Sequence, residues 1–146
     1  GPFHDTFYSD SYTVRGNDYQ NVTTGPMETV SRPNWGARFI LIENMTVKLA
    51  KQLHSRNYYG QAVGVSIGCL PDEIETVVVR NVTVLRGDDD PNAVAVEVNG
   101  PKNVIIENIL TDLPGGIPIT VHNVKHLTWQ NNRRFDGSPL VNPMTT

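Results

Sequence analysis

The chain has 146 residues, a length that fits one domain with a buried core, and its net charge of −3 gives no reason to expect nucleic acid or an anionic membrane as partner. The single cysteine excludes an internal disulfide, and no apolar run approaches the roughly 18 residues of a membrane span. With 18 valines and 14 asparagines against 5 alanines, the composition favours strands and turns over helices.

The chain opens on Gly1-Pro2 without a methionine, and residues 1–12 are interpreted as the scar of a removed expression tag followed by a lead-in. No signal peptide is visible. Regular strand patterns predict one domain over residues 13–134. Residues 135–146 are expected to form an extended tail, interrupted by prolines and apolar at Phe135, Leu140 and Val141.

Four segments repeat one pattern, in which apolar residues alternate up to an asparagine and resume after it. They read RFILIENMTV, ETVVVRNVTV, KNVIIENILT and the degraded KHLTWQNNRR, and a weaker copy, NDYQNVTT, precedes them. Their asparagines are Asn21, Asn44, Asn81, Asn108 and Asn131, which lie 23, 37, 27 and 23 residues apart. A minimum near 23 with variable insertions is typical of a solenoid whose coils share one cross-section.

A second apolar strand lies between successive copies, as AVGVSIG, AVAVEVNG and IPITVHN. Alternation predicts one set of residues facing inward, namely Val63, Val65, Ile67, Val94, Val96, Val98, Ile117, Ile119 and Val121. The intervening residues should face outward, namely Gly64, Ser66, Ala95, Glu97, Pro118 and Thr120. No stretch with helical periodicity is long enough for a crossover helix, which argues against a βαβ fold.

The repeated asparagine has a structural reason. Apolar positions fall at even distances before it and at odd distances after it, so the chain must bend there, and asparagine tolerates the left-handed conformation of a tight bend. Stacked side-chain amides could then hydrogen-bond from coil to coil in a buried ladder. Asn123 lies at a looser corner, and its replacement is expected to cost far less than that of Asn81.

The strands and turn asparagines resemble the right-handed parallel β-helix of the pectin-lyase-like superfamily, which also includes phage tailspikes. The resemblance covers roughly residues 13–132 and implies an all-β solenoid of about five short coils with an asparagine ladder. It does not choose between lyases, glycosidases, epimerases and tailspikes. A β-sandwich with turn asparagines is the alternative fold.

A ligand groove is expected on the outer side of the second strands, flanked by residues 48–62 and 85–92. Small and polar outward residues suit a glycan, while aromatic rings stack on sugars and arginine supplies hydrogen bonds. The expected ligand-binding residues are His54, Arg56, Tyr58, Tyr59, Ser66, Glu97 and Thr120. The three carboxylates Asp88–Asp90 are most often explained by a solvated loop tip, and a cation site or a raised pKa are the alternatives.

Catalysis is not indicated by these residues. Glycoside hydrolysis needs two carboxylates about 5 to 9 Å apart, and only Glu97 with Asp88, Asp89 or Asp90 offers weak candidates. The Asn-x-Asp, Gly-His-Gly and Arg-x-Lys motifs of pectin-degrading families are missing from the sequence. The histidines lack metal-ligand spacing, so neither a metal nor a cofactor is expected.

A stack of about five coils is only about 24 Å tall and leaves unpaired strand edges at both ends. Viral tailspikes meet this difficulty by trimerising. We therefore expect a tailspike- or fibre-like domain that recognises cell-surface polysaccharide as a homotrimer, in a virion tail or at a cell surface, without nucleic acid or membrane insertion. The alternatives are a fragment of a polysaccharide-degrading glycosidase or lyase, and a purely structural shaft.

Overall fold

The computed structural model describes the backbone of residues 3–6, 11–15, 27–30, 38–49, 63–86 and 92–144, and the side chains of the last three ranges. These residues form strands and turns and contain no helix. Consequently, no helix in the described part of the chain is long and apolar enough to cross a membrane.

The strands form two parallel sheets. Sheet A consists of β1 (Phe3–Thr6), β3 (Met27–Val30), β5 (Val63–Gly68), β7 (Val94–Asn99) and β9 (Ile119–His122), in that order. Sheet B runs in the order β10 (His126–Gln130), β8 (Asn103–Thr111), β6 (Thr76–Leu85), β4 (Phe39–Lys48) and β2 (Ser11–Arg15), and β11 (Arg133–Arg134) also pairs with β8.

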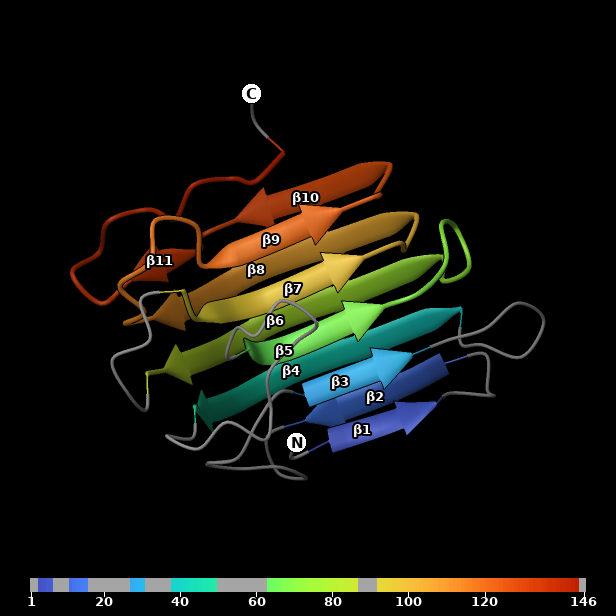
Figure 1. Ribbon diagram of the computed structural model, residues 1–146, viewed down its shortest axis with the longest axis horizontal. Coiled ribbons are helices and arrows are strands. Elements are labelled where there is room, and N and C mark those ends of the chain that lie inside the picture. The colour runs from blue at the N-terminus through green and yellow to red at the C-terminus, as the bar shows by residue number, and fades with distance from the viewer. Residues whose placement is uncertain are drawn as a thin grey trace.

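From β1 to β10 the chain changes sheet after every strand, so each strand from β1 to β8 pairs in parallel with the strand two places further along. The two sheets lie one in front of the other (Figure 1) and do not close on one another. The expected all-β fold with parallel strands is therefore confirmed for the described residues. β1 and the first residues of β2 fall within the segment interpreted as a lead-in.

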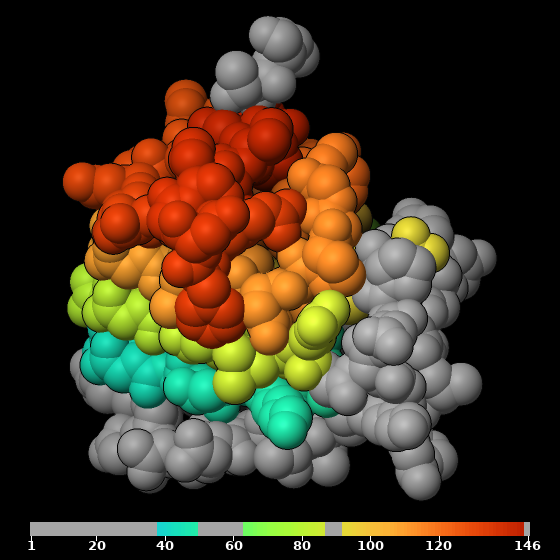
Figure 2. All heavy atoms as spheres, turned by 90° about the vertical axis from the view of Figure 1, so that its left-hand side faces the viewer, coloured from blue at the N-terminus to red at the C-terminus, as the bar shows by residue number. Residues whose placement is uncertain are grey.

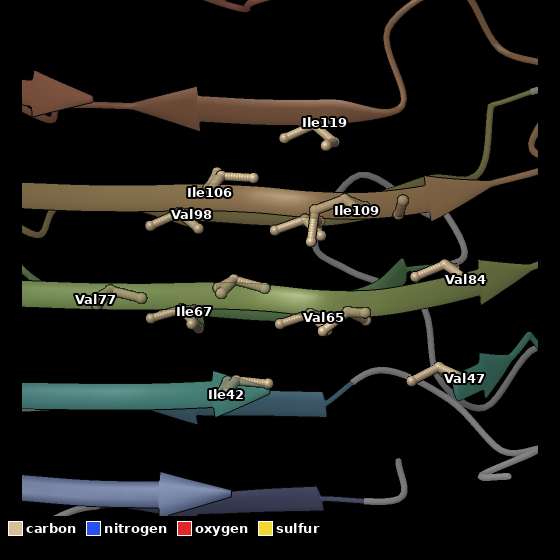
Figure 3. Close-up of a cluster of buried hydrophobic side chains, with 14 of the residues drawn as sticks. Ile42, Val47, Val65, Ile67, Val77, Val84, Val98, Ile106, Ile109 and Ile119 are labelled. Atoms are coloured by element: carbon tan, nitrogen blue, oxygen red, sulfur yellow. The ribbon is translucent and has the colours of Figure 1, made fainter. Parts of the chain in front are cut away.

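The core lies between the sheets and is built from stacked aliphatic side chains (Figure 3). The apolar positions of the repeat face inward, as their alternation predicts: Val79 and Ile106, each two residues before a repeated asparagine, are 0 % exposed. The predicted inward residue Val96 is also 0 % exposed. Val79 lies in register between Ile42 and Ile106. Val96 lies in register between Val65 and Ile119. Each such side chain contributes about 1.5–3 kcal/mol by its burial.

The strands of sheet B bend at the repeated asparagines. Asn44, Asn81, Asn108 and Asn131 have φ values of 58°, 53°, 54° and 56°, which confirms the expected left-handed conformation. The side-chain amide of Asn81 donates to Asn44 at 3.0 Å, and that of Asn131 donates to Asn108 at 2.5 Å.

Three expectations about these corners need correction. All four asparagines of sheet B are exposed, so their amides hydrogen-bond at the surface and not in a buried stack. Hydrogen bonds between side-chain amides join these asparagines in two pairs, because no such hydrogen bond links Asn81 to Asn108 among the described side chains. At the corner after sheet A, Asn123 has φ 54° and donates to Asn99 at 2.9 Å, so this corner is built as tightly as the other.

At the start of β5 and β7, Val63 and Val94 are buried as predicted, but Gly64 and Ala95, which were expected to face outward, are buried as well. Ala95 is 0 % exposed within the core, and a Cβ on Gly64 would lie 2.8 Å from the core side chain of Val84. The N–H groups of Ala95 and Val96 both donate to the carbonyl of Pro118, at 2.6 and 3.4 Å. Two successive donors on one acceptor are the mark of a β-bulge, which shifts the alternation by one residue.

Two residues that directly precede β9 also differ from the prediction. Pro118 is buried, although it was expected to face outward. Ile117 was expected to face inward and is 59 % exposed. Beyond the bulge the predicted alternation holds, because Val65, Ile67 and Val98 are buried.

Candidate functional site

A column of polar side chains crosses the outer face of sheet A, which we call face A. Ser66, Glu97 and Thr120 occupy equivalent positions of β5, β7 and β9 and are half-buried. The Ser66 hydroxyl donates to Glu97 Oε2 at 3.0 Å. Thr120 makes no side-chain hydrogen bond within the described part of the chain. These three residues, the polar column, are the predicted site residues that the structure brings together.

The register extends this column onto the less completely described strands. Glu28 of β3 is the Cα partner of Ser66, and His4 of β1 is the partner of Glu28. The strands of sheet A contain the acidic residues Asp5, Glu28 and Glu97 and neither lysine nor arginine. Sheet A therefore has an acidic composition along its strands.

The other predicted site residues lie outside the described residues: His54, Arg56, Tyr58, Tyr59, Asp88, Asp89 and Asp90, together with Asn21 of the expected ladder. The described strands nevertheless show where the two loops attach. Both follow strands of sheet B, β4 and β6, and lead into β5 and β7 of sheet A. They therefore enter the sheet that carries the polar column.

The outer face of sheet B, which we call face B, carries a column that sequence reasoning missed. Glu43, Arg80 and Glu107 are partners in register, with Arg15 and Gln130 next in line at its two ends. Arg80 Nε donates to Glu43 Oε2 at 2.5 Å, and Glu43 is only 5 % exposed. Opposite charges on neighbouring strands attract, and the sequence signal was their shared position one residue before each bend asparagine.

A row of apolar residues lies beside this charge column on face B. Leu41 and Val78 are partners in register and are 8 % and 7 % exposed, and the next partner, Ile105, is half-buried. Face B thus includes outward residues that are almost fully buried, namely Glu43, Leu41 and Val78, whereas the polar column of face A is half-buried.

The corner after β5 contains the free thiol of Cys69, which packs against Gly100. A Cβ on Gly100 would lie 2.2 Å from the Cys69 carbonyl, and Gly100 has φ 108°, so only glycine fits there. Burial, with smaller effects from Glu73 and Asp72, raises the pKa of Cys69 from 9.0 to about 11. The thiol is therefore protonated at neutral pH and is a poor nucleophile.

No group of three or more His, Cys, Asp or Glu that could hold a metal ion occurs within residues 38–49, 63–86 and 92–144. Comparison of the chain with family models, with curated proteins and with solved structures gives no match. The polar column is accordingly the candidate site, on the grounds of its own geometry.

Proposed function

We propose that the chain is a right-handed parallel β-helix that binds a cell-surface polysaccharide through face A, as part of a homotrimeric, tailspike- or fibre-like assembly. The strand-by-strand alternation between two parallel sheets supports the β-helix, because a coiled chain returns to each sheet once per turn. The left-handed asparagines between strand halves support it further.

The polar column is the observation that carries the binding proposal. Its residues are one strand apart, so hydroxyl and carboxylate groups repeat about every 4.8 Å across the face. Sugar hydroxyls bind such oxygens, and a carboxylate has about four lone-pair sites, so Glu97 can hold the Ser66 hydroxyl and a ligand hydroxyl together. A flat array of this kind suits an extended chain of sugar rings.

The charge of sheet A selects among polysaccharides. Its strands carry only acidic ionisable residues besides two histidines, and a carboxylate repels the uronates of an acidic polymer. Neutral or amine-bearing sugars match this face, because their hydroxyl and ammonium groups donate to Glu97.

A glycan array with neutral, amine-bearing and uronate oligosaccharides tests the proposal. Glu97→Gln should weaken binding of the preferred glycan about tenfold, because a charge-assisted hydrogen bond is lost. Glu107→Gln is the matched control, since Glu107 is also half-buried but belongs to face B. Equal losses in both variants would contradict a site on face A, and no binding to any glycan would favour the structural shaft.

One observation favours hydrolysis as a second candidate function. Glu28 and Glu97 hold positions two strands apart in one column, with Ser66 between them. Two strand spacings are about 10 Å, near the upper end of the carboxylate separation in inverting glycosidases. Release of reducing sugar from the glycan that binds, abolished in both Glu28→Gln and Glu97→Gln, would establish it; no release would leave binding alone.

A further inference from the structure

Residues 132–140 contain β11 and the segment that folds back antiparallel to it, and we call them the return hairpin. Arg133 forms an antiparallel bridge with Pro139. The Arg134 N–H donates to the Ser138 carbonyl at 2.9 Å, and the Leu140 N–H donates to the Asn132 carbonyl at 2.9 Å. The turn is closed by Gly137, which has φ 87° and donates to the Arg134 carbonyl at 3.0 Å.

Asn132 anchors the hairpin from inside. Asn132 directly follows the bend asparagine of its repeat, at the position that the apolar residues Val82 and Ile109 occupy in other repeats. Although its side chain is a polar amide, Asn132 is only 2 % exposed. Its Oδ1 accepts from Ile109 N–H at 3.0 Å and its Nδ2 donates to the Ile106 carbonyl at 3.1 Å. One side chain thus satisfies two buried backbone groups on either side of the β8 bend.

Leu140 covers the end of the core. It is 5 % exposed and belongs to the core cluster, against which Leu127 and Trp129 are partly buried. Arg134 secures the adjoining loop, donating to the Leu113 carbonyl and, at 2.7 Å, to the Gly115 carbonyl. Figure 2 shows the C-terminal residues, in red, over the upper part of this end of the molecule. Leu140, which was expected to lie in an extended tail, therefore packs on the core of its own chain.

We propose that the return hairpin is a cap that prevents a second copy of this chain from stacking head to tail on the β9–β10 end. β9 and β10 are the edge strands at this end, and β1 and β2 are those at the other. All strands within each sheet are parallel, so a copy stacked head to tail would bring its β2 to β10 in the direction that β10 already pairs with β8.

The register makes a second copy a fitting occupant of the β9–β10 end once the return hairpin is removed. In a stack, Thr128 of one copy would lie next to Thr13 of the following copy, and Gln130 would lie next to Arg15. The first contact would continue the column of register partners Thr13, Leu41, Val78, Ile105 and Thr128, and the second would continue the charge column of face B. Neither junction opposes like charges. The hairpin blocks this growth because it pairs antiparallel at Arg133 and because Pro139 has no N–H to offer a further strand.

Sedimentation velocity over a range of protein concentrations tests the cap on Leu140→Ser. This change removes the anchor in the core, and the matched control is Val141→Ser, whose side chain is 60 % exposed. Leu140→Ser should reach a weight-average mass at least about twice that of the wild-type particle and form linear rows in electron micrographs. Val141→Ser should sediment as the wild-type protein does.

A folded Leu140→Ser protein with the mass of the wild type would overturn the proposal, and so would amorphous aggregates without linear order. If circular dichroism shows that Leu140→Ser does not fold, Gly137→Val decides by the same readouts. A Cβ at Gly137 meets nothing within 4 Å, so valine strains the turn through its φ of 87° and leaves the core intact.

Discussion

Face A and face B differ although the same type of parallel strand carries both. On face B the outward residues Glu43, Leu41 and Val78 are almost fully buried, and the charge of Glu43 is neutralised by Arg80. On face A the polar column is half-exposed, and its internal contact is a hydroxyl–carboxylate hydrogen bond. Buried, paired groups stabilise a fold, whereas half-exposed oxygens can still bind a ligand. We infer that face B serves stability and face A serves recognition.

The largest effect on stability is expected from a charge placed on the core side of sheet B. Val79→Asp should prevent folding, because the carboxylate would be buried in the core without a partner. Val78→Asp, one residue away on face B, should lower the free energy of unfolding by about 2–4 kcal/mol and leave a folded protein, since the new carboxylate can turn towards water. Urea unfolding of both variants measures the difference. A well-folded Val79→Asp protein would show that the assigned register is wrong.

The charge column of face B should give the next largest effect. Glu43→Gln should lower the free energy of unfolding by about 1–2 kcal/mol, because it removes a buried charge from its pair with Arg80, whose own side chain is 40 % exposed. Glu107→Gln, on the other side of Arg80 and half-buried, should cost less than about 0.5 kcal/mol. Equal costs in thermal unfolding would mean that burial of Glu43 does not matter.

The bends on the two sides should respond alike. Asn81→Ala should lower the free energy of unfolding by about 1–2 kcal/mol, because alanine is strained at φ 53° and the side-chain hydrogen bond to Asn44 is lost. Asn123→Ala should cost a similar amount, since Asn123 has the same conformation and a bond to Asn99. Asn81→Gly should lower the free energy of unfolding by less than Asn81→Ala does, because glycine adopts φ 53° without strain. If Asn123→Ala proves nearly neutral, the corner of sheet A is looser than its geometry indicates.

The smallest effect at neutral pH is expected at Cys69. With its pKa raised to about 11 from 9.0, the folded protein should react with thiol reagents about a hundredfold more slowly than an ordinary thiol. The same shift contributes stability that is fully present below pH 9 and is lost as the pH rises through about 11. Cys69→Ala should remove this alkaline loss, and labelling kinetics with unfolding at pH 7 and pH 10 check both statements.

The core of this fold could be predicted from the sequence because hydrophobic alternation and the parity change at each asparagine are local signals. Val79 and Ile106 are buried as predicted for this reason. The bulge at Ala95 could not be predicted, because it depends on the carbonyl of Pro118, which directly precedes another strand, β9. The buried role of Asn132 was visible only as a break in the repeat, since its partners belong to β8.

The candidate site was predicted in part for the same physical reason. The outward positions of Ser66, Glu97 and Thr120 follow from alternation beyond the bulge, and the structure aligns them across neighbouring strands. The pairing of Arg80 with Glu43 depends on which strands are neighbours and in which register. That information is fixed by the fold, so the sequence read alone did not distinguish a stabilising column from a binding one.

The division between the two faces is tested most directly by measuring glycan affinity and the free energy of unfolding on the same two variants, Glu97→Gln and Glu43→Gln. The account predicts that Glu97→Gln loses affinity about tenfold for the glycan selected on the array while its stability changes by less than about 0.5 kcal/mol. Glu43→Gln should show the opposite, with stability lowered and affinity unchanged. Loss of affinity in Glu43→Gln together with unchanged affinity in Glu97→Gln would contradict it.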